Sequence, residues 1–164
     1  MEGERLRVTL IEDAVEVGAP AAAVWQAIKD PAVHAGWHPF LTEIKGEHGA
    51  GAERVCTVNL GGKVSHTRER CIADEAERRI IWRIDEDSSG FSRMVNEWTA
   101  GFSLEPRSGG TSVTAQSSFR PRSLFVRLAM PMVRRKFHQT QKAILSGLKQ
   151  HVEAAAASPA EPVG

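Results

Sequence analysis

The feature that most constrains the fold is a run of alternating apolar and polar residues from position 54 to position 119. Successive side chains of a β-strand point to opposite faces, so a period of two predicts strands. Short turns, such as Gly61-Gly62, divide the run, and a Gly-Gly pair favours a two-residue hairpin because type I′ turns need two positive φ angles. The expected strands span residues 54–60, 63–73, 79–85, 93–104 and 111–119. Because all the connections are short, we expect an antiparallel meander.

Helical patterns flank this meander on both sides. After a strand at residues 6–17, Pro20 suits the first turn of a short helix, and Asp30 can cap a second one that begins at Pro31 and ends before Pro39. Residues 123–153 have helical periodicity, with a kink expected at Pro131, whose ring removes one backbone hydrogen bond. Apolar residues that recur every three or four positions predict one stripe packed on the sheet: Met130, Val133, Phe137, Thr140, Ile144 and Leu148.

Length and composition favour one soluble domain. The chain has 164 residues, and we expect a single α+β domain over residues 1–153 followed by a disordered tail at 154–164. The N-terminus has no apolar signal segment, and no stretch approaches the ~18 apolar residues of a membrane span. We therefore expect a cytoplasmic protein without stable membrane insertion. With 21 basic and 20 acidic side chains, the net charge favours neither nucleic acid nor an anionic membrane.

Several local motifs resemble one known superfamily in both order and spacing. They are Ala19-Pro20 leading into Val24-Trp25 and Asp30, the Trp37-His38-Pro39 step, Gly110-Thr111 before a strand, and the segment at residues 145–149. Together they resemble the START/Bet v 1-like (SRPBCC) helix-grip superfamily, of the polyketide cyclase/dehydrase and lipid-transport type. The resemblance covers roughly residues 6–153. It implies a curved antiparallel sheet of about seven strands wrapped on a long C-terminal helix.

The resemblance implies a ligand-binding protein and leaves three functions open. The first is binding or carriage of a small hydrophobic ligand, such as a lipid, polyketide or isoprenoid-like compound. The second is a polyketide aromatase/cyclase-type enzyme, and the third is a co-chaperone-like protein-interaction module. A buried arginine or histidine pair in a deep pocket would favour the enzyme. A filled interior beside an exposed apolar patch would favour the interaction module.

Small residues under the long helix predict an internal cavity. Ala115 and Ser117 lie at the centre of the last strand, so we expect a largely apolar cavity of roughly 300 Å³ or more. Residues expected to line it or to form its gate are Trp37, Thr57, Ser65, Thr67, Trp82, Asn96, Trp98, Ser117, Leu128 and Phe137.

The strand at residues 63–73 has two possible inward faces. Ser65, Thr67 and Glu69 form one, and Arg68 and Arg70 belong to the other; we expect the arginines to face solvent, since a buried arginine needs an acidic partner. Aromatase/cyclases of the superfamily carry Trp-x-Ser-x-Arg on this strand. Here Val64-Ser65-His66 resembles part of that pattern, with Lys63 and Thr67 at the tryptophan and arginine positions. The chain also has no tyrosine that could act as an acid.

No recognisable metal or cofactor motif accompanies these residues. His34 and His38 have i, i+4 spacing, but a third ligand is not close in the sequence. We expect no metal, no cofactor and no catalytic motif, and a monomer or weak homodimer.

The segment before Pro131 is apolar on almost every side. We expect residues 123–130 and Trp37 to form a gate, with Arg127, Arg134 and Arg135 just outside it as a cationic rim.

Overall fold

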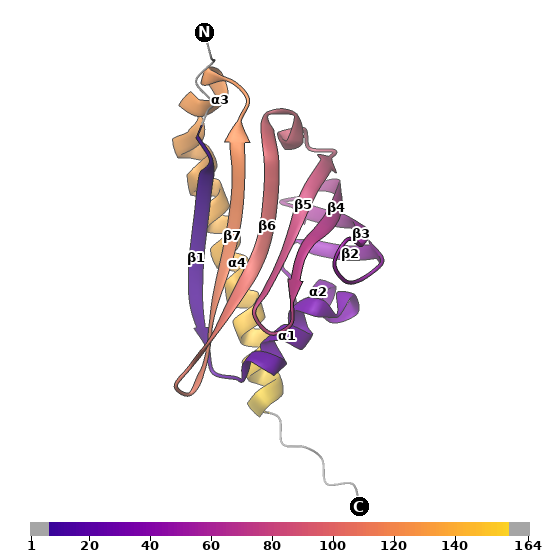
Figure 1. Ribbon diagram of the computed structural model, residues 1–164, viewed down its shortest axis with the longest axis vertical. Coiled ribbons are helices and arrows are strands. Elements are labelled where there is room, and N and C mark those ends of the chain that lie inside the picture. Colours follow the sequence, from indigo (N-terminus) through magenta and orange to yellow (C-terminus); the bar gives the residue numbers. More distant parts are fainter. Residues whose placement is uncertain (1–6, 158–164) are drawn as a thin grey trace, which may run out of the picture.

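A single antiparallel sheet forms the framework of the protein. The computed structural model describes residues 7–157. Its seven strands lie in the order β1-β7-β6-β5-β4-β3-β2 (Figure 1). Their bounds are β1 Thr9–Val17, β2 Leu41–Gly46, β3 Glu53–Leu60, β4 Lys63–Glu75, β5 Arg79–Asp87, β6 Val95–Arg107 and β7 Gly110–Pro121. From β2 to β7 each strand pairs with the next, which confirms the meander.

The helices lie on one side of this sheet. α1 (Ala21–Lys29) and α2 (Pro31–Trp37) carry the chain from β1, at one edge, to β2 at the other. The Asp30 side chain caps α2 by accepting from the Ala32 N–H (3.0 Å), as the sequence predicts. α3 (Leu124–Leu128) and α4 (Met130–Ala157) follow β7, and α4 packs mainly on β1 and β7 (Figure 1). A long helix held against a curved sheet is the expected helix-grip arrangement.

The helical break lies just before Pro131. α3 ends at Leu128 and α4 begins at Met130, so Pro131 occupies the first turn of α4, where its missing N–H costs little. At the other end, α4 continues through Ala157, four residues beyond the expected end of the domain, because alanine is the strongest helix former. The rest of the expected tail, residues 158–164, lies outside the described residues.

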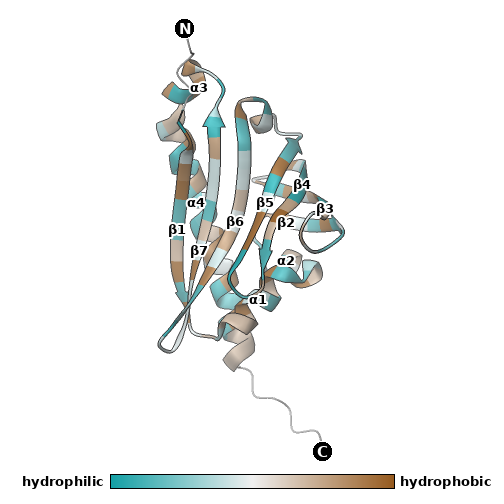
Figure 2. Ribbon diagram, viewed as in Figure 1, coloured by the Kyte–Doolittle hydropathy of each residue, from teal (hydrophilic) through white to brown (hydrophobic). Residues whose placement is uncertain are grey.

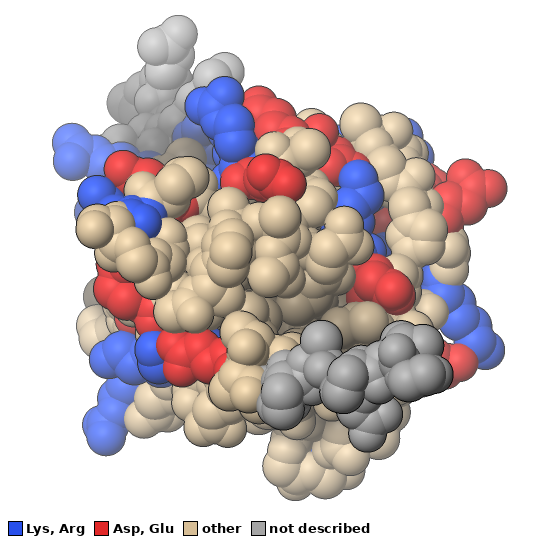
Figure 3. Space-filling model, turned by 90° about the horizontal axis from the view of Figure 1, so that it is seen from below, with Lys and Arg blue, Asp and Glu red and all other residues tan. Residues whose placement is uncertain are grey.

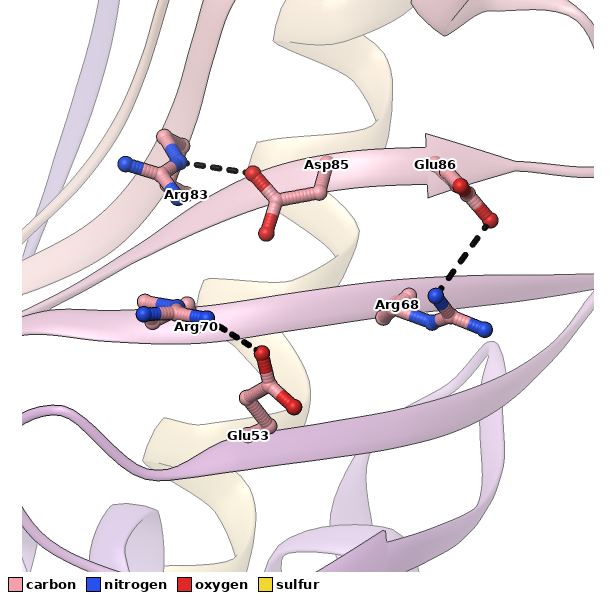
Figure 4. A network of polar contacts seen from close by, with 6 residues as sticks. All are labelled: Glu53, Arg68, Arg70, Arg83, Asp85 and Glu86. Carbon is pink, nitrogen blue, oxygen red and sulfur yellow. Dashed lines mark hydrogen bonds and ion pairs between the residues drawn. The ribbon is translucent and has the colours of Figure 1, made fainter.

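The outer face of the sheet is polar and carries a ladder of ion pairs. Arg70 pairs with Glu53, Arg68 with Glu86 and Arg83 with Asp85, all pointing away from α4 (Figure 4). This confirms that Arg68 and Arg70 face solvent. Brown and teal segments alternate along several strands (Figure 2), as expected for a sheet with one face against a core.

The core consists of two apolar clusters separated by a polar layer. The larger cluster joins α1, α2 and the C-terminal half of α4 to the sheet, and the smaller one centres on Phe119 and Met130. Between them the Ser117 hydroxyl donates to Gln141 Oε1 (2.9 Å), and Gln141 Nε2 donates to Asp13 (2.8 Å). His138 Nδ1 also contacts Asp13 (2.8 Å). Every buried polar group of this layer is therefore paired.

Candidate ligand-binding site

The inner face of the sheet is only partly covered at its centre. Trp98 and Ala100 on β6 point inward, and both remain partly exposed. On α4, Phe137 and Ile144 belong to the predicted inward stripe, and they also remain partly exposed. Side chains that face one another from helix and sheet, yet keep contact with solvent, define the candidate site.

Aromatic rings fill the space that the small residues of β7 leave. Phe119 is fully buried, and its ring lies 5.4 Å from that of Phe137. Trp98 and Phe91 complete the group, with their rings 4.9 Å apart and in T-shaped contact. Gln141 occupies the position opposite Ser117. The prediction of a cavity of roughly 300 Å³ beneath Ala115 and Ser117 is therefore wrong, because long side chains from α4 reach into the gap.

A narrow pocket opens nearer to α1. It has room for about one water molecule, with a volume of 20 Å³, and its lining includes Lys29, Arg54, Cys71, Asp74 and Trp82. A volume of this size does not accommodate an organic ligand.

A buried ion pair connects β3 to β4 on the inner face. Arg54 Nε lies 3.3 Å from Glu69 Oε2, and the two side chains are only 12% and 10% exposed. The Cys56 thiol donates to the same carboxylate oxygen (2.9 Å), and the Arg54 guanidinium lies over the Trp82 ring at 3.7 Å. Burial, followed by the nearby Glu69 charge, raises the pKa of Cys56, which keeps it a thiol. One oxygen of the carboxylate, Oε2, is therefore engaged by a cationic and a neutral donor.

Two histidines lie beside this ion pair and are neutral. Burial lowers the pKa of His38 to about 4, and Arg54 contributes. His38 Nδ1 accepts the N–H groups of Phe40 (3.1 Å) and Leu41 (2.9 Å), which a protonated nitrogen could not do. Burial also lowers the pKa of His34 well below its usual value, with His38 and Arg54 adding to the effect. Both rings therefore act as packing and hydrogen-bonding groups at neutral pH.

Two buried polar atoms on the inner face have no hydrogen-bond partner within residues 7–157. They are Thr67 Oγ1 and Trp98 Nε1. Cys56 lies opposite Thr67, and a hydrogen bond from the Thr67 hydroxyl to the Cys56 sulfur acts to lower the pKa of the thiol. Sulfur is a weak acceptor, so this contact replaces a hydrogen bond to oxygen only in part. Leaving a buried polar group unpaired costs about 1–3 kcal/mol, so such groups are rare. Each atom can accommodate one further hydrogen bond, to water or to a ligand.

The sheet register gives the approximate separation of the Cα atoms of these two residues. Glu69, two residues after Thr67, pairs with Ile84 on β5, and Trp98 precedes Thr99, the partner of Arg83. Since neighbouring strands lie about 4.8 Å apart and residues rise ~3.4 Å along a strand, Thr67 and Trp98 are roughly 10–12 Å apart on one face.

Six of the ten residues predicted from the sequence lie on the inner side around this region. Trp82 and Ser117 are buried, Ser65, Thr67 and Trp98 are partly covered, and Phe137 faces them from α4. Trp37 is also buried, but its Nε1 donates to the Ala27 carbonyl (2.8 Å) and its ring stacks on His34. That anchoring makes Trp37 part of the core and unsuited to the predicted gate.

The remaining three predicted residues point away from the site. Thr57 lies on the outer face, where its hydroxyl contacts His66 (3.2 Å). Asn96 is exposed and pairs with Arg120 across β6 and β7, next to a bulge at Glu97, whose φ is 53°. Leu128 is 81% exposed at the end of α3. An alternating pattern divides the residues of a strand into two sets without showing which set faces inward. A polar residue of either set could therefore be predicted to line the site.

The ion pair of Arg54 and Glu69 was missed by the sequence reasoning. A signal existed, because a two-residue turn at Gly61-Gly62 makes Leu60 face Lys63 and fixes every pair behind it. Counting back from that turn places Arg54 opposite Glu69, and Cys56 opposite Thr67. Arg54 and Glu69 have opposite charges and occupy paired positions on β3 and β4. If Glu69 faces inward, as one of the two alternatives had it, Arg54 faces inward beside it and the two form an ion pair.

Comparison with known proteins identifies the family. Residues 9–153 match the family described as polyketide cyclase / dehydrase and lipid transport. The chain belongs to this family. A comparison with curated protein sequences finds no match.

Solved structures of the same fold are similar over nearly their whole length. The Zhui aromatase/cyclase from a Streptomyces species is 19% identical, with a TM-score of 0.75, covering 93% of this chain and 98% of that one. A START superfamily protein from Mycobacterium smegmatis is 14% identical (TM-score 0.73; 89% and 98% covered). Norcoclaurine synthase from Thalictrum flavum, in complex with dopamine and hydroxybenzaldehyde, is also 14% identical (TM-score 0.71; 94% and 91% covered). These neighbours and the family establish a START/polyketide cyclase-type hydrophobic ligand-binding fold.

Residues 7–157 contain neither a membrane-spanning helix nor a cluster of metal-ligating side chains. No helix there has the length and hydropathy needed to cross a bilayer. The same residues hold no group of three or more histidine, cysteine, aspartate or glutamate side chains placed to bind a metal ion.

Proposed function

We propose that the protein binds a small, largely apolar molecule on the inner face of β4–β6, against the partly exposed rings of Trp98 and Phe137. The observation that carries this proposal is the pair of unpartnered buried atoms, Thr67 Oγ1 and Trp98 Nε1. An indole N–H only donates, so the ligand presents an acceptor to Trp98, while the Thr67 hydroxyl takes either role. An elongated molecule with a polar group near each end can satisfy both atoms.

The surroundings support binding of an apolar body between these two polar atoms. The small side chain of Ala100 leaves room above the sheet, and Ile144 and Phe137 present apolar surface from α4. Burying such partly exposed surface against an apolar ligand contributes about 25 cal/mol per Å². Apolar contact therefore provides affinity, and the two polar atoms provide orientation.

The test uses substitutions that remove a polar atom while keeping shape. Anilinonaphthalene sulfonate, an apolar probe with one anionic group, is titrated against the parent, Thr67→Val and Trp98→Phe proteins. Loss of one hydrogen bond worth about 1 kcal/mol should raise Kd roughly fivefold in each variant. Thr57→Val, on the outer face of the same hairpin, is the matched control and should bind like the parent. Equal affinity of all four proteins would contradict the proposal.

Native mass spectrometry of freshly purified protein addresses the natural ligand. A co-purifying organic molecule should be present in the parent and depleted in the Thr67→Val, Trp98→Phe double variant. Its mass then identifies which of the lipid, polyketide and isoprenoid-like classes it belongs to.

Catalysis is a second candidate function, and Glu69 is the observation that favours it. This buried carboxylate lies on the inner face, two residues from Thr67, with Arg54 beside it. A positioned carboxylate can move a proton during ring closure or dehydration. Binding remains the preferred function, since Glu69 Oε2 already accepts from Arg54 and Cys56. Turnover of a reactive polyketone by the parent, abolished by Glu69→Gln, would establish the enzyme.

A further inference from the structure

The upper end of the molecule exposes a group of large apolar side chains that the ligand site does not use. Leu124, Phe125 and Leu128 on α3 are 68%, 81% and 81% exposed, and Met132 in the first turn of α4 is 78% exposed. We name these four residues the α3 tip. On a helix, residues 124, 125 and 128 share one arc of about 100°, opposite Val126, which is buried. The short helix therefore anchors itself through Val126 and directs its apolar arc to solvent.

Several cations lie in the same segment as this apolar group. Between Glu105 and Glu153 the sequence has nine lysines and arginines and no aspartate or glutamate. Four of the cations, Arg122, Arg127, Arg135 and Lys136, are exposed in the same segment as the α3 tip. Among the described residues none of the four makes an ion pair, whereas Arg120, nearby on β7, is paired with Glu97. The near balance of charge over the whole chain thus conceals an uneven distribution of charge along the sequence.

Two other exposed regions within residues 7–157 differ from the α3 tip. Seen from the opposite end, basic and acidic side chains are interspersed around the rim (Figure 3). On the outer face of the sheet, the exposed Val64 and Ile72 lie on β4 among the paired charges of Arg68 and Arg70. Within residues 7–157 the four most exposed large apolar side chains are those of the α3 tip, and they lie in the same segment as four exposed cations without an ion pair.

We propose that the α3 tip docks reversibly on the surface of a membrane that contains anionic lipids. Membrane binding at an interface needs two contributions, apolar side chains that enter the acyl boundary and cations that meet anionic head groups, and the tip supplies both. α3 lies at one extremity of the molecule (Figure 1), so its side chains can reach a flat surface without obstruction by the sheet. A protruding tip of this kind can enter a bilayer, whereas an acidic protein partner would be expected to bind a groove or a flat patch. The shape therefore favours a bilayer. The inference goes beyond ligand binding and does not depend on it.

Vesicle co-sedimentation tests the proposal on the full chain. The protein should bind vesicles of phosphatidylcholine with 30% phosphatidylserine, and should bind pure phosphatidylcholine weakly. Substitution of both Phe125 and Leu128 by serine should weaken partitioning into these vesicles roughly 10- to 30-fold. Substitution of both Arg127 and Arg135 by glutamine should have an effect of the same size, since each charge near the surface contributes about fivefold. The matched controls are Val64→Ser with Ile72→Ser for the apolar pair, and Lys63→Gln with Arg78→Gln for the charges. Both controls should bind like the parent.

A spectroscopic readout reports the depth of the contact. Leu128→Cys and Val64→Cys proteins are labelled with a nitrobenzoxadiazole fluorophore; the native Cys56 and Cys71 are buried and react slowly. Emission should shift to the blue on vesicles for position 128 and stay unchanged for position 64. Circular dichroism checks that each variant folds, as expected for substitutions at exposed sites.

Three outcomes would overturn the proposal. They are no binding to anionic vesicles, vesicle binding that the tip variants leave unaltered, and binding to a soluble polyglutamate peptide in place of vesicles. The last would assign the α3 tip to an acidic protein partner. Anilinonaphthalene sulfonate titration of the tip variants separates the two functions, since their inner site is intact and should bind the probe like the parent.

Discussion

Gly101 lies in the middle of β6, where the backbone of β5 approaches too closely for a side chain. A Cβ at this position would lie 2.2 Å from the Ile80 carbonyl oxygen. Because the obstructing atom belongs to a paired strand, only a shift of the sheet relieves the contact. Packing therefore requires glycine at position 101. Its backbone does not have the positive φ that often accounts for a glycine.

Gly101→Ala should destabilise the protein by about 2 kcal/mol or more, the usual cost of overpacking a core. Gly36→Ala is the matched control, because nothing lies within 4 Å of the added Cβ in α2. Alanine in a helix should raise stability by roughly 0.5–1 kcal/mol. Urea unfolding midpoints measure both, and equal midpoints for the two variants would contradict the packing argument.

At the scale of the element, α4 is attached to the sheet by a polar layer as well as by its apolar stripe. Gln141 bridges Ser117 on β7 and Asp13 on β1. Since the layer lies between the two apolar clusters, a slip of the helix by one turn would leave all three groups unpaired. The layer therefore fixes the register of α4 on β1 and β7.

Gln141→Leu should lower the free energy of unfolding by about 1–3 kcal/mol, because it leaves the buried Ser117 hydroxyl without an acceptor. The double variant Ser117→Ala, Gln141→Leu removes both partners and should be more stable than the single variant. Chemical denaturation of the parent, the Ser117→Ala and Gln141→Leu variants and the double variant gives a double-mutant cycle. A double variant whose loss equals the sum of the single losses would show that the two residues are not coupled.

At the scale of the whole molecule, the neutral histidines His34 and His38 couple folding to pH. The pKa of His38 is about 4 in the folded protein and about 6.5 in the unfolded chain. Between these two pH values the unfolded state therefore binds more protons than the folded state. The contribution of His38 to the free energy of unfolding is fully present above pH ~6.5 and is lost as the pH falls toward 4. The lowered pKa of His34 acts in the same direction.

The loss attributable to His38 should be about 3 kcal/mol across this pH range. His38→Asn tests it, because asparagine Oδ1 can accept the N–H groups of Phe40 and Leu41 without titrating. Urea unfolding at pH 7.5 and 4.5 should give a clearly smaller stability difference for the variant than for the parent. The same pH dependence in both proteins would assign the effect to other groups.

The sequence by itself determined the elements and their order. Period-two alternation, the Gly61-Gly62 turn, the Asp30 cap and the stripe from Met130 to Leu148 are local, since each depends on neighbours within a few residues. The motifs around Trp25 and Trp37 then led to the family. The sequence pattern did not predict the bounds of β2, because the strand Leu41–Gly46 is short and its alternation is weak.

Only the tertiary structure decided what fills the space between helix and sheet. Whether Ser117 borders a cavity depends on Gln141 and Phe137, which lie more than 15 residues away and reach it only after α4 has docked. The face that Thr57 and Asn96 occupy follows from hairpin register and from the bulge at Glu97. The exposure of Leu128 follows from Val126, which fixes the rotation of α3. Each of these outcomes is a contact between distant segments, and a linear pattern of hydrophobicity does not encode its geometry.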